Sequence, residues 1–141
     1  MQHTIQRPSV SHAAAQAVVE AAVRAAQGTP VAYAVAVVDA GGHLTAFARM
    51  DGAPVMAIQV AQDKAYTAAG FGMSTERWHE FIKDDAPLAL GAPAGVERLV
   101  AFGGGVPIIL DGHVVGGVGV CGGHWSDDVK IAEAGLAALD R

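Results

Sequence analysis

The sequence has one cysteine and few charged residues. Cys121 stands alone among 141 residues, so no disulfide can form within the chain. Charged residues make up only 16% of the sequence and hydrophobic residues 52%. This composition excludes a disordered chain and indicates that partner subunits cover much of the surface. We therefore expect a homo-oligomer, a dimer or larger, built from a single domain over residues 1–141.

Clusters of basic residues and long apolar runs are also missing. The chain carries 9 basic and 14 acidic residues, for a net charge of −5. Without a Lys/Arg cluster, neither nucleic acid nor an anionic membrane is an expected partner. No apolar run approaches the roughly 18 residues of a membrane span, and residues 1–12 lack the apolar core of a signal peptide. We expect a cytoplasmic protein.

The first half of the chain predicts a helix, a hairpin and a second helix. Ser9 or Ser11 can cap a helix with apolar residues at three-and-four spacing, which Gly28 ends. Residues 31–39 form a nearly apolar run, and a turn with two glycines joins them to the alternating run 43–50. This pattern predicts a β-hairpin whose first strand is central. A helix is expected over residues 57–70 and a short one from Ser74 or Thr75 through Phe81.

The second half predicts three strands and a final helix. Residues 84–100 are expected to be irregular because they contain several prolines and glycines. Strands are expected over 99–102, 106–110 and 113–121, and Asp111-Gly112 is a strong hairpin signal between the last two. Ser126 is the expected cap of the last helix. Hairpins without long crossovers predict an antiparallel sheet with helices packed on it, an α+β fold.

Lys64 lies on an unusual face of its predicted helix. Val60, Ala61, Thr67 and Ala68 share this face, so the ammonium emerges from a small, apolar surface. In one interpretation the long side chain snorkels past its neighbours to solvent. In the other, Lys64 is a pocket cation that binds an anionic ligand.

Glycines mark a second set of candidate positions. Gly116, Gly117 and Gly119 lie within one predicted strand, which implies that a helix or a flat ligand packs very closely on it. The turns at 103–105 and 122–123 have backbone N–H groups that could bind a carboxylate or a phosphate. Purely structural glycines remain the alternative at both turns.

Candidate reactive side chains follow the last strand. Cys121 and His124 could form a nucleophilic pair, with Asp127 nearby for acid–base chemistry. Too few ligands are present in this loop for a zinc site by themselves. His12, in the first turn of the first helix, is either an exposed residue or a haem ligand, and His124 is a second candidate for the axial position.

Several motifs together resemble a known family. VVDAGGHL, RMDGA, KAYTA and VPIILDGHVVGGVGV occur in order along the chain, and this combination resembles the GlcG/HbpS-like, or haem-degrading, domain family. That family includes the C-terminal domain of PduO-type cobalamin adenosyltransferases. The shared pattern comprises Asp39, Gly41, Gly42, Arg49, Asp51, Gly52, Lys64, Tyr66, Thr67, Gly112, Gly116, Gly122 and Gly123.

The resemblance implies a profilin-like fold with a five-stranded antiparallel sheet flanked by helices. It also implies assembly into dimers or higher oligomers and haem binding, with haem degradation or redox sensing in some relatives. The chain departs from the family pattern at Cys121, at His124-Trp125-Ser126 and at Trp78-His79. No histidine belongs to the shared pattern, so no axial ligand is transferred from it.

Two functional hypotheses involve a ligand, and a third is a structural or regulatory oligomer with a vestigial pocket. In the first, the protein is an oligomeric haem-binding protein whose pocket lies between the Lys64 helix and the glycine-rich turns. In the second, it is a small enzyme that acts on an organic acid in a catabolic pathway without a cofactor. Lys64 and the Gly122–Gly123 turn would then hold a carboxylate, and His124 with Cys121 or Asp127 would perform the chemistry. The ligand-binding set common to these hypotheses is completed by Arg49, Asp51 and Thr67.

Overall fold

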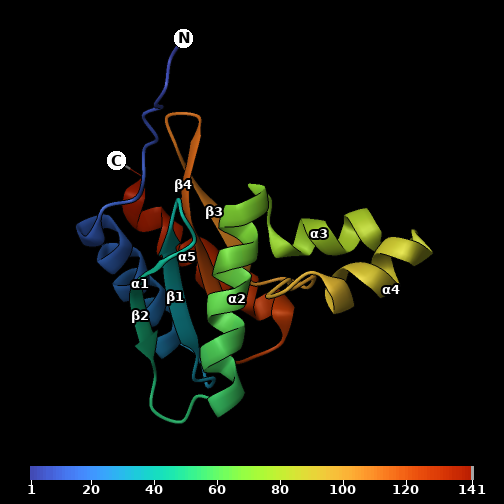
Figure 1. The fold of residues 1–141 in the computed structure, drawn as a ribbon. Helices are drawn as coiled ribbons and strands as arrows, with labels where there is room; N and C mark the ends of the chain where they lie inside the picture. Colours follow the sequence, from blue (N-terminus) through green and yellow to red (C-terminus); the bar gives the residue numbers. More distant parts are fainter. Residues whose placement is uncertain (141) are drawn as a thin grey trace.

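The computed structural model describes residues 1–140 and contains one antiparallel sheet with helices on both faces (Figure 1). Its four strands lie in the order β2-β1-β4-β3. The helices are α1 (His12–Gln27), α2 (Val55–Phe71), α3 (Thr75–Ile82), α4 (Ala86–Gly95), α5 (Trp125–Leu136) and the short η1 (Ala137–Leu139). The strands are β1 (Ala34–Asp39), β2 (Leu44–Arg49), β3 (Gly105–Leu110) and β4 (His113–Cys121). The predicted α+β class with an antiparallel sheet is confirmed.

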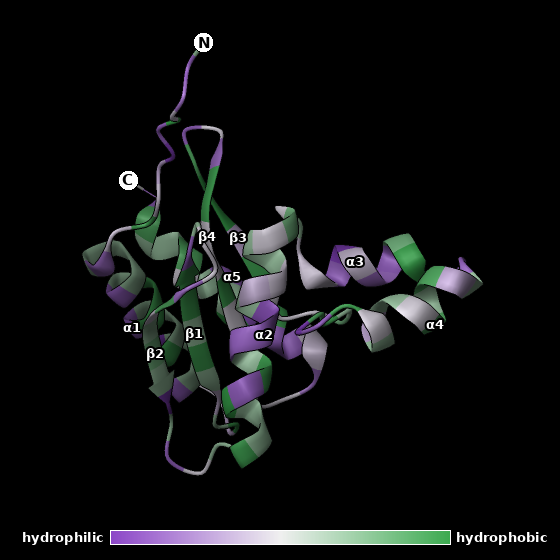
Figure 2. Cartoon of the chain, viewed as in Figure 1, coloured by the Kyte–Doolittle hydropathy of each residue, from purple (hydrophilic) through white to green (hydrophobic). Residues whose placement is uncertain are grey.

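Strand β1 separates two hydrophobic cores. Its side chains alternate between the two faces, as in any strand. Val35 and Val37 pack with α1 and α5, whereas Ala34, Ala36 and Val38 pack against the alanines of α2. Figure 2 shows the hydrophobic colouring of β1 and β4 between the helices. The prediction of a central strand covered on both faces is therefore confirmed.

Helix α2 packs directly on the glycines of β4. A Cβ atom added at Gly119 would lie 1.9 Å from the carbonyl oxygen of Ala61, and one at Gly117 would lie 2.4 Å from that of Ala65. No larger residue fits at these positions unless the helix moves. The close partner predicted for this strand is thus a helix, and the small residues on both surfaces allow the approach.

Two predicted details of the strands and caps are wrong. Residues 99–102 form no strand, so the sheet has four strands rather than five. The Val100 N–H instead donates to Oγ1 of Thr67, which itself donates to the carbonyl of Arg98, so a helix side chain satisfies this backbone. Helix α5 begins at Trp125, and its N-cap is His124 rather than Ser126.

Residues 86–95 form helix α4 where an irregular segment is predicted. Asp85 caps the helix by accepting a hydrogen bond from the Leu88 N–H, and Pro87 lies in the first turn, where a missing N–H costs nothing. Pro93 lies near the end of the helix. The prolines therefore lie near the two ends of a short helix. Prolines at this spacing are also typical of a loop, which is why the sequence predicts an irregular segment.

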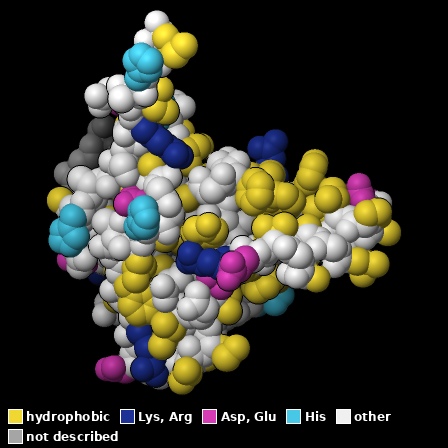
Figure 3. Space-filling model, in the orientation of Figure 1, with side chains coloured by type: hydrophobic (Ala, Val, Ile, Leu, Met, Phe, Trp, Pro, Cys, Tyr) yellow, Lys and Arg dark blue, Asp and Glu magenta, His cyan; other side chains and the backbone are white. Residues whose placement is uncertain are grey.

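Helices α3 and α4 form an arm that projects from the body of the molecule (Figure 1). None of the residues of α4 is buried, and Leu90 is 78% exposed. Hydrophobic side chains gather over this arm in Figure 3. Across residues 1–140 no helix combines the length and the apolar character needed to cross a membrane.

Candidate functional site

Lys64 of α2 is fully buried and paired with a carboxylate on α5. Its Nζ atom lies 2.8 Å from Oδ2 of Asp128, which is also buried. The ammonium donates a second hydrogen bond, of 2.9 Å, to the carbonyl oxygen of Val120. It also lies 4.9 Å from the centroid of the Phe102 ring. Since Lys64 is 0% exposed, the interpretation that its side chain snorkels to solvent is wrong.

The second oxygen of Asp128 accepts a hydrogen bond of 3.1 Å from the Gly123 N–H. Burial raises the pKa of Asp128 above its usual value, and the hydrogen bond and charge of Lys64 offset only part of that rise. The carboxylate that lies between Lys64 and the Gly122–Gly123 turn is therefore that of Asp128, and not that of a ligand. A ligand carboxylate would have to displace Asp128 and leave it buried without its partners, which is costly.

Cys121, His124 and Asp127 have separate surroundings. The Nδ1 atom of His124 lies 2.7 Å from Oγ of Ser126 and accepts from the Ser126 N–H. Asp127 is exposed and lies 3.5 Å from Lys130. Burial raises the pKa of the half-buried Cys121 thiol, which keeps the thiol protonated at neutral pH. Among residues 1–140 no side-chain hydrogen bond joins Cys121, His124 and Asp127 to one another; only the Asp127 backbone N–H donates to the His124 carbonyl, as part of the helix start.

The remaining predicted residues are spread over the molecule. His12 is exposed at the start of α1, and Asp51 is exposed in the turn after β2. Arg49 donates a hydrogen bond of 3.3 Å to the carbonyl of Ala53. Thr67 is buried, and its hydroxyl fixes the backbone of the loop that follows α4. In the described part of the chain, no three His, Cys, Asp or Glu side chains come together as a metal site would require.

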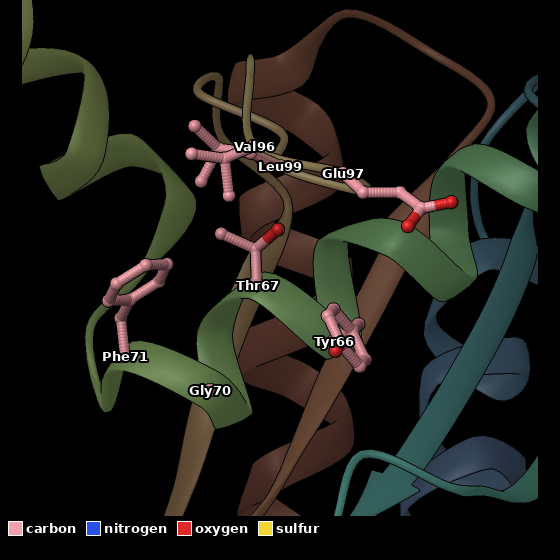
Figure 4. Close-up of a pocket in the computed structure, with 7 residues that line it drawn as sticks. All are labelled: Tyr66, Thr67, Gly70, Phe71, Val96, Glu97 and Leu99. Carbon is pink, nitrogen blue, oxygen red and sulfur yellow. The ribbon is translucent and has the colours of Figure 1, made fainter. Parts of the chain in front are cut away.

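Three cavities lie in a row along the segment 96–103, which links α4 to β3. The first, of about 240 Å³, lies between α2 and this segment; its lining residues are Tyr66, Thr67, Gly70, Phe71, Val96, Glu97 and Leu99 (Figure 4). Figure 4 shows Gly70 as its floor, with Phe71 toward one end and Tyr66 toward the other. Leu99 also lines the second cavity, so the two adjoin.

The second cavity lies beneath the arm and has a volume of about 410 Å³. Apolar side chains predominate in its lining, which consists of His79, Ile82, Lys83, Ala89, Pro93, Leu99, Val100, Ala101 and Phe102. Its volume falls within the ~300–1,000 Å³ typical of small-molecule sites. His79 is its one imidazole and Lys83 its one cation. Histidine is a common axial ligand of haem iron, and this cavity combines one imidazole with mostly apolar lining residues.

The third cavity, of about 190 Å³, shares His79 and Phe102 with the second. Its other lining residues are Glu76, Glu80, Gly103 and Trp125. The predicted pocket between α2 and the glycine-rich turns is filled by the Lys64–Asp128 pair instead. The sequence signal that could have located the cavities is the Trp78-His79 departure from the family pattern, because His79 lines two of them.

The aromatic residues around α3 hold the arm to α2. The Trp78 ring makes edge-to-face contacts with Phe71 and Phe81, at centroid distances of 4.7 and 5.6 Å. Trp78 is buried, and its indole N–H has no partner within residues 1–140. These rings serve packing. This cluster sets the position of His79, the next residue along α3.

Known proteins resemble this chain over nearly its full length. Protein GlcG of Escherichia coli is 35% identical over 111 residues, which cover 79% of this chain and 80% of that protein. The crystal structure of Klebsiella pneumoniae protein ORFY superposes with a TM-score of 0.90 at 30% identity, covering 99% of this chain and 97% of that one. A crystal structure of a PduOC:heme complex superposes with a TM-score of 0.86 at 30% identity, covering 92% and 94%.

The family model for the haem degrading protein HbpS-like family matches residues 10–137. This range contains the complete sheet and helices α1 to α5. The match agrees with the family resemblance of the sequence motifs and with the superposed structures. The chain therefore belongs to the HbpS-like family of haem degrading proteins.

Proposed function

We propose that this protein binds haem in the 410 Å³ cavity beneath α3 and α4, with His79 as the axial ligand. The observation that carries the proposal is that His79 lines this apolar cavity, whereas His12 and His124 line none of the three cavities along the segment 96–103. The crystal structure of PduOC, which is 30% identical to this chain, is that of a heme complex. This similarity supports haem as the ligand.

The residues of the cavity suit the different parts of a haem. Apolar side chains such as Leu99 and Val100 would contact the macrocycle, and the His79 imidazole would ligate the iron. Lys83 lies at the edge, 2.6 Å from Glu80, and it could exchange this exposed partner for a propionate at little cost. Bound haem would supply the redox chemistry, while the chain's own residues would bind it and limit its contact with water.

The test is a titration of the protein with hemin, followed by the Soret absorbance. We expect saturable binding by the wild type and by His12→Ala and His124→Ala, and a lost or shifted band with His79→Ala. Saturable binding that depends on His12 or His124 instead would reject the assignment of His79. Absence of saturable binding in the wild type would reject haem binding itself.

A matched pair of substitutions on α4 tests the location. Ala89 lines the cavity, whereas Ala94 is exposed on the same helix and outside the lining. Ala89→Trp should therefore weaken hemin binding at least about tenfold by filling the space, and Ala94→Trp should leave it unchanged. Equal affinities of the two variants would place haem elsewhere on the protein.

Haem degradation is a second candidate because the family description names it. Hemin-loaded protein incubated with ascorbate in air distinguishes the two activities. Loss of the Soret band faster than for free hemin, with formation of an open-chain tetrapyrrole, would support degradation. A stable band would restrict the protein to binding. The alternative of an organic-acid enzyme gains no support. Its substrate carboxylate would bind Lys64 and the Gly122–Gly123 turn, but Asp128 already occupies this position.

We also infer that two copies associate through the arm. An isolated ten-residue helix is unstable in water, yet α4 has no charged residue and none of its residues is buried. Phe81, Leu90 and Val96 are 62%, 78% and 44% exposed, a patch that a monomer rarely leaves uncovered. Leu90→Glu should shift the mass in light scattering toward the monomer. Met56→Glu, at an equally exposed apolar site on α2, is the control.

A further inference from the structure

The third cavity, between α3 and the start of α5, is lined by two aromatic rings and by two carboxylates of α3. The rings are those of Trp125 and Phe102, and the carboxylates are those of Glu76 and Glu80. We propose that this cavity binds a small organic cation, a substituted ammonium ion, between the Trp125 indole and the Glu76 carboxylate. This proposal goes beyond the proposed haem function, although the cavity adjoins the haem cavity and shares His79 and Phe102 with it.

The position of the Trp125 ring is fixed by a glycine. A Cβ atom added at Gly103 would lie 2.7 Å from Cε3 of Trp125, so the ring rests directly on this backbone. Trp125 as a whole is 40% exposed, and an indole face is the best aromatic partner for a cation. The Phe102 ring already has the Lys64 ammonium 4.9 Å from its centroid. Phe102 therefore provides apolar contact, and Trp125 is the ring that binds the charge.

The two carboxylates of α3 differ in availability. Glu80 is paired with Lys83 at 2.6 Å. The carboxylate of Glu76, one turn earlier on the same face, makes no hydrogen bond or ion pair with any residue from 1 to 140. The cavity also contains His79 but no lysine or arginine. Since Glu80 is already paired with Lys83, Glu76 would be the counter-ion of a bound ammonium.

Positive groups near the cavity are already neutralised. The N-terminal end of α5 lies at Trp125, but its first turn carries Asp127 and Asp128. In the first turn of this helix the Ser126 N–H donates to Nδ1 of His124. The Lys64 ammonium behind Phe102 is paired with Asp128. The nearby Lys64 ammonium is thus not available to an anion, whereas a cation finds an open carboxylate and an indole face.

The experiment uses the full chain without haem and choline as the probe. Its uncharged isostere, 3,3-dimethylbutan-1-ol, has the same shape without the charge. The chain has two tryptophans, so a ¹H–¹⁵N spectrum contains two indole signals. We expect choline to shift the Trp125 signal saturably, while the signal of the buried Trp78 stays in place. Binding of the alcohol should be at least about tenfold weaker, because it lacks the charge.

Matched variants identify the counter-ion. Glu76→Gln removes the charge from an exposed position without loss of a contact and should weaken choline binding at least about fivefold. Glu133→Gln, exposed on α5 away from the cavity, should bind as the wild type does. Equal shifts by choline and the alcohol, equal affinity of Glu76→Gln, or no saturable shift of Trp125 would each overturn the proposal. The Ala89→Trp variant leaves this cavity open, so failure of haem binding and failure of cation binding can be distinguished.

Discussion

Lys64 and Asp128 form a buried ion pair with an Nζ–Oδ2 distance of 2.8 Å, although 64 positions separate them in the sequence. The pair joins α2, on one face of the sheet, to the first turn of α5. Its remaining hydrogen bonds, to the Val120 carbonyl and from the Gly123 N–H, fix the end of β4 and the turn after it. The pair therefore connects the elements that surround the glycine-rich turns.

Removal of either partner should destabilise the fold strongly. Lys64→Met leaves a buried carboxylate without its counter-ion, and Asp128→Asn leaves a buried ammonium; each should lower the free energy of unfolding by ~3–5 kcal/mol. The double variant Lys64→Met/Asp128→Leu removes both charges and should be more stable than either single variant. Urea denaturation followed by far-UV circular dichroism measures the three values.

An exposed pair on the same helix is the control. Lys130 and Asp127 lie 3.5 Å apart with both side chains largely in solvent. Lys130→Met should change the free energy of unfolding by less than ~0.5 kcal/mol. If Lys64→Met were as mild as Lys130→Met, the buried pair would not have the structural role assigned to it.

Substitution of Gly70 by alanine should stabilise the protein. Gly70 lies inside α2, and a Cβ atom added there has no other atom within 4 Å. Alanine is favoured over glycine in helices, so Gly70→Ala should raise the free energy of unfolding by ~0.5–1 kcal/mol. Gly119→Ala is the contrasting case, because its Cβ would lie 1.9 Å from the Ala61 carbonyl oxygen. Thermal denaturation should give shifts of opposite sign; a stabilised Gly119→Ala would contradict the packing of α2 on β4.

The elements that the sequence predicts well have local signals. Ser11 accepts a hydrogen bond from the Ala14 N–H and caps α1 as expected. Asp111 and Gly112 both have positive φ, of 50° and 77°, which is the conformation of the two-residue hairpin turn that the dipeptide favours. Each signal needs only neighbouring residues, so it can be interpreted without knowledge of the fold.

The parts that escaped prediction depend on distant residues. The small apolar face around Lys64 indicates an unusual lysine but cannot identify Asp128 as its partner. The segment 99–102 has the composition of a strand, yet Thr67 of α2 binds its backbone. The cavity with His79 exists only because α3 and α4 fold back over the segment 96–103. In each case the deciding contact is made by tertiary packing, which a local pattern does not contain.

Cys121 should react slowly with alkylating reagents. Burial raises the pKa of its thiol, so a smaller fraction is thiolate at neutral pH than for a free cysteine. We expect iodoacetamide at pH 7.5 to modify the folded protein several-fold more slowly than glutathione, and the urea-unfolded protein at the rate of glutathione. Mass spectrometry of timed samples gives both rates. Faster reaction in the folded state would instead support the nucleophilic Cys121–His124 pair.

The turn between β1 and β2 should lose stability in acid through Asp39. Burial by itself would raise the pKa of Asp39, but hydrogen bonds from the His43 and Gly41 N–H groups and the imidazole of His43 at 3.4 Å outweigh it and lower the pKa below its usual 3.8. Because the folded pKa is the lower one, the contribution is present above about pH 4 and is lost as the pH falls through the folded value.

Asp39→Asn isolates this contribution. Asparagine keeps an acceptor oxygen for the Gly41 and His43 N–H groups but does not titrate. The urea midpoint should therefore fall less between pH 6 and pH 3 in Asp39→Asn than in the wild type, by an amount equivalent to less than about 1 kcal/mol for this partly exposed side chain. Other carboxylates titrate equally in both proteins and cancel in the comparison. An identical fall in the two proteins would show that Asp39 has the same pKa in the folded and the unfolded chain.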